Sequence, residues 1–249
     1  MPAPPDIASA AKWPKHVPPL SPEQQRISDD FMHYWHAQLP SRYGAFARFN
    51  HGYVVRNAPR DFRRTLEIGP GLGEHLEHER LTDAQAANYY AVDIRDNMAA
   101  DIKRRFPRIN TVVADCQKRM AFEDGFFDRI IAIHVLEHLP DLPAAIRELH
   151  RVCDKARGVL SIVIPCEGSL AYSFARSISA KPMFERRYGQ PYDTFIKREH
   201  INLPHEIFEE IAPYFVRRQS TYFPLPVPLE FCNLCIGATF APREVVGVR

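Results

Sequence analysis

Leu66-Glu67-Ile68-Gly69-Pro70-Gly71-Leu72-Gly73 is the stretch that decides the fold of this chain. Its apolar beginning predicts a short buried strand, and three glycines follow at alternate positions. Glycine has no Cβ, so such a turn can adopt positive φ and let a ligand lie against the main chain. The next segment can begin a helix, whose first amides have no partner within the helix. We therefore expect a nucleotide-type site at the carboxyl end of the first strand of an α/β sheet.

The spacing of the glycines separates two kinds of nucleotide ligand. The dinucleotide fingerprint G-x-G-x-x-G would place its third glycine where this chain has Glu74. Glu67 stands two residues before the first glycine, and a carboxylate there would repel a pyrophosphate but attract a cationic amino group. S-adenosylmethionine carries an ammonium and a sulfonium and no phosphate. A glycine-rich turn without any ligand is the alternative, because short motifs recur by chance.

Two matches give this chain a resemblance to a known family. The segment 67–73 has the form E/D-x-G-x-G-x-G that opens the class I S-adenosylmethionine-dependent methyltransferases. The phrase V-L-E-H-L-P-D at 135–141 is similar to one in small-molecule members of that class, among them ubiquinone-pathway enzymes. The resemblance covers residues 63–168 and, more weakly, 201–243. It implies a Rossmann-like sheet of seven strands, mostly parallel with the last strand antiparallel between the fifth and sixth, and helices on both faces.

Bulk properties favour one sizeable α/β domain with appendages. The chain has 249 residues, of which 45% are hydrophobic and 25% charged. The net charge of +2 and the absence of N-P-P-Y or D-P-P-Y after the fourth predicted strand argue against DNA as the acceptor. Five scattered cysteines fit reduced thiols. With no apolar leader and no stretch of eighteen apolar residues, we expect a cytoplasmic protein without a transmembrane segment.

The order of predicted elements divides the chain into four parts. Residues 1–20 form a loose proline-rich tail, 21–62 an N-terminal helical cap, and 169–200 a lid inserted into the domain made by 63–168 and 201–243. Alternating strands and helices in that domain imply parallel pairing. The predicted strands are 65–69, 89–94, 111–114, 126–133, 159–164, 215–223 and 234–240.

The N-terminal cap is predicted from helical signals. Ser21-Pro22-Glu23-Gln24 has the pattern of a capping box, and Pro40 should end the helix that it begins. A second, weaker helical segment covers about 42–58. The aromatic residues of this region either pack against the core, which we favour, or form a flap over the substrate. The aromatic residues concerned are Tyr34, Trp35, Tyr43 and Phe46. The apolar face of the first helix is predicted from the helical spacing of Ile27, Phe31, Tyr34, Trp35 and Leu39.

Acidic residues after the next strands complete the expected donor site. Asp93 ends the second strand about twenty residues after the glycines, where an acid can accept hydrogen bonds from both ribose hydroxyls. A helix cap is the competing role for Asp93. By resemblance, Asp115 accepts from the adenine amino group and the amide of Cys116 meets the ring. The predicted cofactor-binding residues are Glu67, Gly69, Gly71, Gly73, Asp93, Ile94, Asp115, Cys116 and His134.

Three histidines are the candidate catalytic residues: His200, His134 and His138. His200 is a candidate general base for a hydroxyl acceptor, and a surface role is the alternative. Glu137-His138 resembles the acid–histidine pair that binds a divalent metal in ubiquinone-pathway and small-RNA O-methyltransferases. Those enzymes carry a glutamate where this chain has His134, and magnesium prefers oxygen ligands, so we predict no metal.

The lid and one cysteine pair bear on the acceptor and on metal binding. Aromatic and basic side chains fill 169–200; they either attract an anionic acceptor or form a solvated face. Cys232-x-x-Cys235 has no second C-x-x-C, so packing is the favoured role. The sequence thus predicts methyl transfer to a small-molecule or saccharide acceptor, with oxygen favoured as the methylated atom. The alternatives are N- or C-methylation of a natural-product or lipid-linked acceptor, a nicotinamide-dependent oxidoreductase, and a non-catalytic binding protein.

Overall fold

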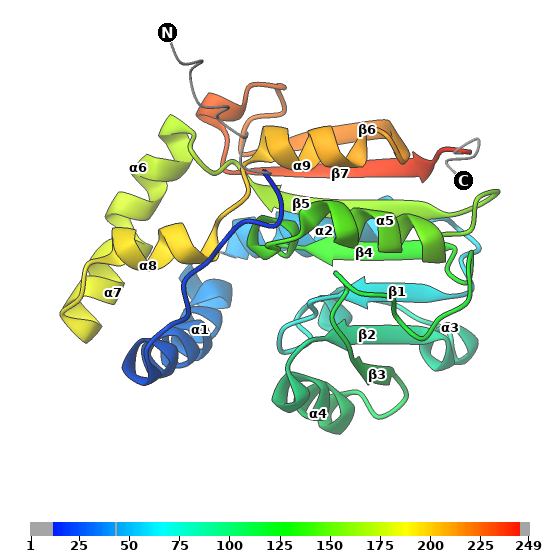
Figure 1. Ribbon diagram of the computed structural model, residues 1–249, viewed down its shortest axis with the longest axis horizontal. Helices are drawn as coiled ribbons and strands as arrows, with labels where there is room; N and C mark the ends of the chain where they lie inside the picture. The colour runs from blue at the N-terminus through cyan, green and yellow to red at the C-terminus, as the bar shows by residue number, and fades with distance from the viewer. Residues whose placement is uncertain (1–11, 43, 245–249) are drawn as a thin grey trace, which may run out of the picture.

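One seven-stranded sheet runs through the molecule in the order β3-β2-β1-β4-β5-β7-β6 (Figure 1). The computed structural model describes residues 12–42 and 44–244, without the side chains of 32 and 35–42. β1 pairs in parallel with β2 and β4, whereas β7 lies antiparallel between β5 and β6, as the resemblance predicted. The strands are β1 Thr65–Ile68, β2 Tyr89–Asp93, β3 Asn110–Val113, β4 Arg129–Ile133, β5 Val159–Pro165, β6 Phe215–Phe223 and β7 Cys235–Pro242.

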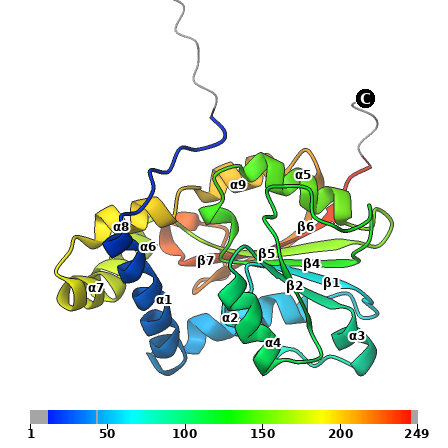
Figure 2. The same ribbon diagram turned by 60° about the horizontal axis from the view of Figure 1, so that its bottom comes forward.

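Helices cover both faces of the sheet, as expected for this fold (Figure 2). On one face α5 (Leu142–Val152) and α9 (Pro204–Ile211) pack on side chains such as Ile130 and Ile162. On the other face α2 (Gly44–Arg56), α3 (Asp83–Ala87) and α4 (Asp96–Arg105) pack on the next residues along the same strands, Ile131 and Val163. Alternate strand residues point to opposite faces, so the near-continuous apolar strands suit burial on both sides.

Helix α2 belongs to the body of the sheet and not to a cap over the site. The Tyr53 ring lies against β7 where Gly237 leaves room: a Cβ on Gly237 would come within 2.5 Å of the ring. The Tyr53 hydroxyl and Thr239 Oγ1 are 3.0 Å apart in a hydrogen bond. The two helices of the predicted cap therefore have different surroundings, because α1 (Pro22–Arg42) packs elsewhere.

The predicted lid consists of three helices beside the carboxyl ends of β1 and β4 (Figure 1). They are α6 (Leu170–Ile178), α7 (Ala180–Tyr188) and α8 (Tyr192–Glu199). Phe31 of α1 packs edge-on against Phe184 of α7 at 5.0 Å and against Phe195 of α8 at 5.9 Å. Lid and α1 thus share a small aromatic core of their own, separate from the two cores of the sheet.

Several local predictions hold and others need correction. The capping box at Ser21 and Gln24 is present, and Asp141 caps α5. Pro40 does not end α1, which runs to Arg42, because near a helix end proline removes a backbone hydrogen bond without forcing the helix to stop there. After the glycines the chain forms only the 3-10 helix η1 (His75–His78), since His75 and Leu76 turn into the interior.

The N-terminal segment is bound to the domain from residue 12 onward. Trp13 Nε1 donates to Glu210 Oε1 at 3.0 Å, and Lys15 Nζ lies 2.6 Å from Glu206 Oε2. The prediction of a loose tail is therefore wrong for 12–20, while 1–11 lie outside the described residues, as do the side chains of Trp35 and Leu39 and all of Tyr43. No helix in the described ranges combines the length and apolarity needed to cross a membrane.

Candidate active site

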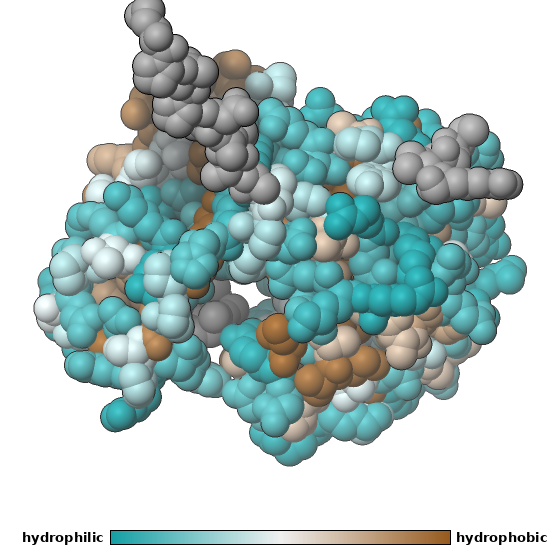
Figure 3. All heavy atoms as spheres, viewed as in Figure 1, coloured by the Kyte–Doolittle hydropathy of each residue, from teal (hydrophilic) through white to brown (hydrophobic). Residues whose placement is uncertain are grey.

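The glycine turn has the conformation that its sequence predicts. Gly69, Gly71 and Gly73 have φ of 58°, 59° and 82°, which side chains with a Cβ rarely adopt. A Cβ on Gly69 would lie 2.5 Å from Val135, and one on Gly73 would lie 2.9 Å from Phe106. At these three glycines, the backbone that follows β1 therefore carries no side chain that would keep a ligand away from it. Figure 3 shows the surface hollowed between this part of the sheet and the lid with α1.

Glu67 lies beneath the turn and not at its surface. Its side chain is 2% exposed, and Tyr89 donates its hydroxyl to Glu67 Oε2 at 2.8 Å. Burial raises the pKa of Glu67, so the enclosed carboxyl holds a proton more readily than a free one. In this structure the Glu67 carboxyl is therefore not exposed for the predicted direct contact with a cationic amino group. Glu67 instead fixes the strand that carries the glycines.

A histidine cluster lies on the same side of the sheet. The His51 ring of α2 stacks on His78 at 4.7 Å and on His75 at 5.7 Å. His75 Nε2 lies 2.7 Å from Glu79 Oε1, which also accepts from Arg129. Burial, followed by the neighbouring histidines, lowers the pKa of His51 to about 3. His51 is therefore neutral in the folded protein at any pH near neutrality.

This cluster predicts a loss of stability in mild acid. The ordinary pKa of His51 is 6.5, so below that value the unfolded chain binds a proton that the folded chain refuses. Stability is therefore full above about pH 6.5 and falls as the pH drops toward 3. We expect a loss of about 1–2 kcal/mol between pH 7 and pH 5, a window above the titration of ordinary carboxyls. Urea unfolding at both pH values, with His51→Gln and the exposed control His33→Gln, measures it; an equal pH slope in His51→Gln and the wild type would contradict this role.

The end of β2 carries the predicted ribose ligand beside an apolar surface. Asp93 is 4% exposed, and Arg95 donates from its backbone amide at 3.0 Å and from Nε at 3.1 Å to Asp93 Oδ1. A carboxylate has about four acceptor positions, so Asp93 keeps capacity for hydroxyl donors. Ile94 and Val113, at the ends of neighbouring strands, are 64% and 55% exposed. An exposed apolar pair next to a buried acid suits a nucleoside with a flat base.

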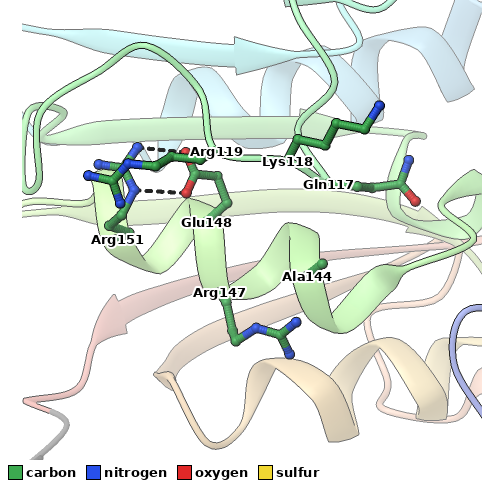
Figure 4. Close-up of a pocket in the computed structure, with 7 residues that line it drawn as sticks. All are labelled: Gln117, Lys118, Arg119, Ala144, Arg147, Glu148 and Arg151. Atoms are coloured by element: carbon green, nitrogen blue, oxygen red, sulfur yellow. Dashed lines mark hydrogen bonds and ion pairs between the residues drawn. The ribbon is translucent and has the colours of Figure 1, made fainter. Parts of the chain in front are cut away.

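The end of β3 carries the predicted adenine contacts. Asp115 Oδ1 accepts from the Gln117 backbone amide at 3.0 Å and from Gln117 Nε2 at 3.1 Å. Cys116 is buried, and burial raises the pKa of its thiol to about 12, so the thiol stays protonated. Gln117 also borders a hollow of about 260 Å³ on the α5 face, away from the glycines (Figure 4). In that hollow Arg151 is paired with Glu148, at 2.6 Å, so we do not assign it to the donor.

His134 occupies a strained position at the end of β4. Its φ of 53° makes it the one residue other than glycine with positive φ in the described ranges. Such strain persists where the surroundings fix it, often at functional sites. His134 Nδ1 lies 3.1 Å from Glu137 Oε1, and its ring stacks on Phe46 of α2 at 5.8 Å. His134 thus connects the sheet edge to the buried Glu137.

His138 and His200 come together although 62 positions separate them in the sequence. Their rings lie 5.0 Å apart. His138 Nδ1 donates to the Glu199 carbonyl at 2.6 Å, and His200 Nδ1 lies 2.7 Å from Glu167 Oε2. Since each Nδ1 is held by an oxygen, the Nε2 of each neutral ring is left as the acceptor. His200 is 13% exposed at its side chain, so the predicted alternative of a surface residue is wrong.

Two acids hold histidines of this site in place: Glu167 is bonded to His200, and Glu137 is bonded to His134. Burial by itself would raise the pKa of Glu167, but the hydrogen bond with His200 and the charge of Arg176 outweigh it and lower the pKa. Burial acts the same way on Glu137, and its bond with His134 together with the nearby histidines lowers its pKa to about 2. Both acids are ionised near neutral pH. They therefore stabilise their histidines with Nδ1 protonated.

Asn202 explains why His200 reaches the sheet edge. Its fully buried side chain donates to the carbonyls of Leu136 at 2.7 Å and Leu139 at 2.8 Å. The Glu137 carbonyl in turn accepts from the amides of Ile201 and Asn202. The segment 200–202 is thus attached to the loop that follows β4. Sequence reasoning missed both Asn202 and Glu167; the position of Glu167 directly after a parallel strand was the available signal.

The same histidines and Glu137 could hold a metal ion. Glu137, His138 and His200 each offer one ligand atom, and these atoms lie within 4.8 Å of one another. Two imidazoles and one carboxylate are typical of zinc and unlike the all-oxygen sets of magnesium. Cys235, by contrast, is buried in β7 with its Sγ 3.9 Å from His134 Nε2, and all five cysteines are free thiols. In the described ranges, neither Cys232 nor Cys235 belongs to this group of possible ligands.

Comparison with known proteins gives a consistent class. Residues 66–162 match the sequence profile of a methyltransferase domain family. A 93-residue stretch is 33% identical to the malonyl-[acyl-carrier protein] O-methyltransferase of Halorhodospira halophila, covering 36% of this chain and 31% of that protein. The chain thus matches about a third of the length of this curated relative.

Solved structures of the same fold extend over nearly the whole chain. The N-methyltransferase NodS of Bradyrhizobium japonicum, in complex with S-adenosyl-L-homocysteine, is 16% identical with a TM-score of 0.58, covering 90% of this chain and 100% of that chain. The PH0226 protein of Pyrococcus horikoshii is 15% identical with a TM-score of 0.59, covering 85% and 99%. The [4+2]-cyclase SpnF shares the fold at 14% identity and a TM-score of 0.55, covering 78% and 80%.

Sheet order, glycine turn and family match define the class of this protein: it has the fold of the class I S-adenosylmethionine-dependent methyltransferases. Residues 66–162, about two fifths of the chain, match the model of the methyltransferase domain family. SpnF shows that the fold alone does not fix the reaction, so the reaction has to be argued from the site.

Proposed function

We propose that this protein transfers a methyl group from S-adenosylmethionine to a hydroxyl of a small-molecule or saccharide acceptor. One observation carries the proposal: a glycine turn without side chains follows β1, and a half-buried histidine pair, in which His200 is bonded to Glu167, lies after the neighbouring strand β4. The first suits the donor, and the second suits a proton that leaves the acceptor. The family match and the fold of NodS support the choice of donor.

The donor would extend along the ends of β1, β2 and β3. The main chain at Gly69, Gly71 and Gly73 would meet its methionine part, and Asp93 would accept from the ribose hydroxyls. Ile94 would face the adenine ring, and Asp115 with the Cys116 amide would meet its edge. Glu67 is proposed to support the turn through Tyr89, because its carboxyl does not reach the surface.

The reaction needs alignment and one proton acceptor. The acceptor oxygen attacks the methyl carbon in line with the sulfonium; an O–C bond forms, the C–S bond breaks and its electron pair stays on sulfur. The hydroxyl proton goes to His200 Nε2, and Glu167 stabilises the imidazolium through Nδ1. We propose that His138 and His134 position this pair without a metal. The products are the methylated acceptor and S-adenosylhomocysteine.

The site also supports a ranking of the alternatives. A neutral amine is a good nucleophile before it loses a proton, so an amine acceptor would depend less on His200 than a hydroxyl does. N-methylation therefore predicts a milder effect when His200 is replaced. A nicotinamide cofactor is disfavoured because Glu74 replaces the third glycine of the dinucleotide fingerprint. A purely binding protein would not need an acid-supported histidine beside the donor. Basic side chains in the lid favour an anionic acceptor.

Calorimetry with the unliganded protein tests the donor. We expect S-adenosylmethionine and S-adenosylhomocysteine to bind with dissociation constants of about 1–100 μM, and NADH to show no heat of binding. The loaded protein is then offered alcohols, phenols, nucleotide sugars and amines, with S-adenosylhomocysteine formation as the readout. Binding of NADH alone would replace the proposed class, and donor binding without transfer to any acceptor would favour the binding protein.

A further inference from the structure

Seven large apolar side chains gather on one exposed surface next to the lid. Of the exposed large apolar residues in the described ranges, only Ile94 and Val113 lie elsewhere. The surface joins α6 to the loop between β6 and β7, two segments that lie side by side, and brown atoms mark it at the upper left of Figure 3. We call it the apolar rim; its members, 39–76% exposed, are Leu170, Phe174, Ile178, Leu225, Val227, Leu229 and Phe231.

Helix α6 turns its apolar side outward. Leu170, Phe174 and Ile178 are spaced by four residues, so they share one face of the helix. The helix is fixed in this orientation from its other side, where Arg176 binds Glu167 at 2.6 Å and the Tyr172 ring stacks on His200 at 6.4 Å. The exposed stripe is therefore the consequence of contacts that hold the candidate active site.

The loop of the rim is held in place by one buried side chain. Asn233 is fully buried, and its Nδ2 donates to the carbonyls of Val227 at 3.1 Å and Leu229 at 2.9 Å. Its Oδ1 accepts from the Leu225 amide at 2.8 Å. Ser169, which caps α6, donates to the Asn233 carbonyl at 3.2 Å. Asn233 thus holds both the loop and the start of α6 in place, and the apolar side chains of the rim project from this fixed backbone.

We propose that the apolar rim docks this protein onto the surface of an anionic lipid bilayer. Hydrocarbon requires that backbone polar groups find partners within the protein. Much of the loop backbone meets this requirement: prolines at 224, 226 and 228 have no N–H, and the Leu229 amide donates to the Val227 carbonyl at 2.8 Å. Between 224 and 232 the only charged residue is Glu230.

The neighbouring lid offers basic side chains to such a membrane. Residues 169–200 contain six lysines and arginines against three acids. Arg176, Lys181 and Arg187 are paired with Glu167, Asp193 and Asp30. In the described ranges no ion pair joins an acid to the other three, which are Arg186, Lys197 and Arg198. Apolar side chains at the acyl boundary together with basic residues at the headgroups are the usual features of proteins that lie on anionic membranes. A second copy of this chain would bring one basic lid near another, which disfavours it as the occupant.

The proposal does not depend on methyl transfer, although the two would fit together. Glu167, which holds His200, is followed within three residues by Leu170 of the rim. An acceptor with a lipid tail could therefore reach His200 while its tail remains in the bilayer. Membrane docking and donor binding are measured separately, so the failure of one is distinguishable from the failure of the other.

Vesicle co-sedimentation of the full chain tests the proposal without any donor. We expect binding to vesicles of phosphatidylcholine mixed with phosphatidylglycerol, and at least about tenfold weaker binding to phosphatidylcholine alone. The double variant Phe174→Ser and Phe231→Ser should bind the mixed vesicles at least about tenfold more weakly, since both rings are exposed and their loss leaves the core intact. Val113→Ser, which removes an exposed apolar residue far from the rim, is the matched control and should bind like the wild type.

Three results would overturn docking to an anionic bilayer. One is wild-type protein that stays in the supernatant with both kinds of vesicle. Another is a double variant that binds as tightly as the wild type. The third comes from analytical ultracentrifugation: a wild-type dimer that the double variant converts to a monomer would show that a second copy covers the rim. Urea unfolding of the double variant, compared with the wild type, confirms that it is folded.

Discussion

Gly71→Ala is expected to weaken S-adenosylmethionine binding by about 100-fold while the protein stays folded. The residue has φ of 59°, and a Cβ there would meet only Glu74 Oε2, at 3.2 Å. That contact is with the end of a flexible side chain, so the folded state can accommodate the methyl group. The main chain, however, would lose the bare surface on which the donor is proposed to lie, and with it about two hydrogen bonds.

The chain offers a matched control for this prediction. Gly189, at the end of α7, has φ of 66°, and a Cβ there would have no heavy atom within 4 Å. Gly189→Ala therefore introduces the same backbone strain, about 1–2 kcal/mol, away from the proposed donor site. We expect both variants to lose similar stability in urea unfolding and only Gly71→Ala to lose donor affinity in calorimetry. Equal donor affinity in the two variants would move the donor away from the glycine turn.

His200→Gln is expected to lower turnover by about 100- to 1000-fold and to change donor affinity less than twofold. Glutamine places an amide near the position of Nε2 but cannot take a proton from the acceptor. Glu167→Gln should lower turnover less, because the imidazole remains and only its charge partner is lost. The measurement is S-adenosylhomocysteine formation with the acceptor that the panel identifies, with donor affinity from calorimetry.

His205→Gln is the control for the loss of a histidine from the same part of the chain. His205 lies five residues later and is exposed, so its replacement should leave turnover unchanged. Treatment of the wild type with EDTA should also leave turnover unchanged, as a metal-free base requires. A strong loss with EDTA that zinc restores would instead assign Glu137, His138 and His200 to a metal. A full rate in His200→Gln would remove this residue from the chemistry.

Local patterns allowed much of the sheet and the donor side to be predicted. Segments of four to nine residues with a strand pattern predicted the positions of all seven strands, with ends that differ from the observed ones by at most three residues. Positive φ at Gly69, Gly71 and Gly73 followed from residue type and spacing, because only glycine tolerates that backbone without strain. The positions of Asp93 and Asp115 followed from the rule that parallel strands end at one edge.

Contacts between distant segments could not be predicted in this way. Glu67 is in the motif, yet its side chain lies with Tyr89 on the far side of the turn, because strand alternation and the packing of α2 decide which face it meets. For residues 169–200 the composition predicted a lid rich in aromatic and basic side chains, but no pattern predicted where its helices begin and end. The place of α2 depends on the space above Gly237, a feature that involves residues almost two hundred positions apart.

The sequence by itself thus determined where each strand lies along the chain, the conformation of the glycine turn and the acids that follow the next strands. These features depend on backbone sterics and on short-range periodicity. Only the tertiary structure decided that Glu167 holds His200, that Asn202 fastens the segment carrying it to the loop after β4, and that Asn233 displays an apolar loop to the outside. The first two are hydrogen bonds between groups far apart in the chain, and the third closes a loop that is buried at one point only in the folded protein. Such bonds form only after packing has brought the segments together and removed water from between them.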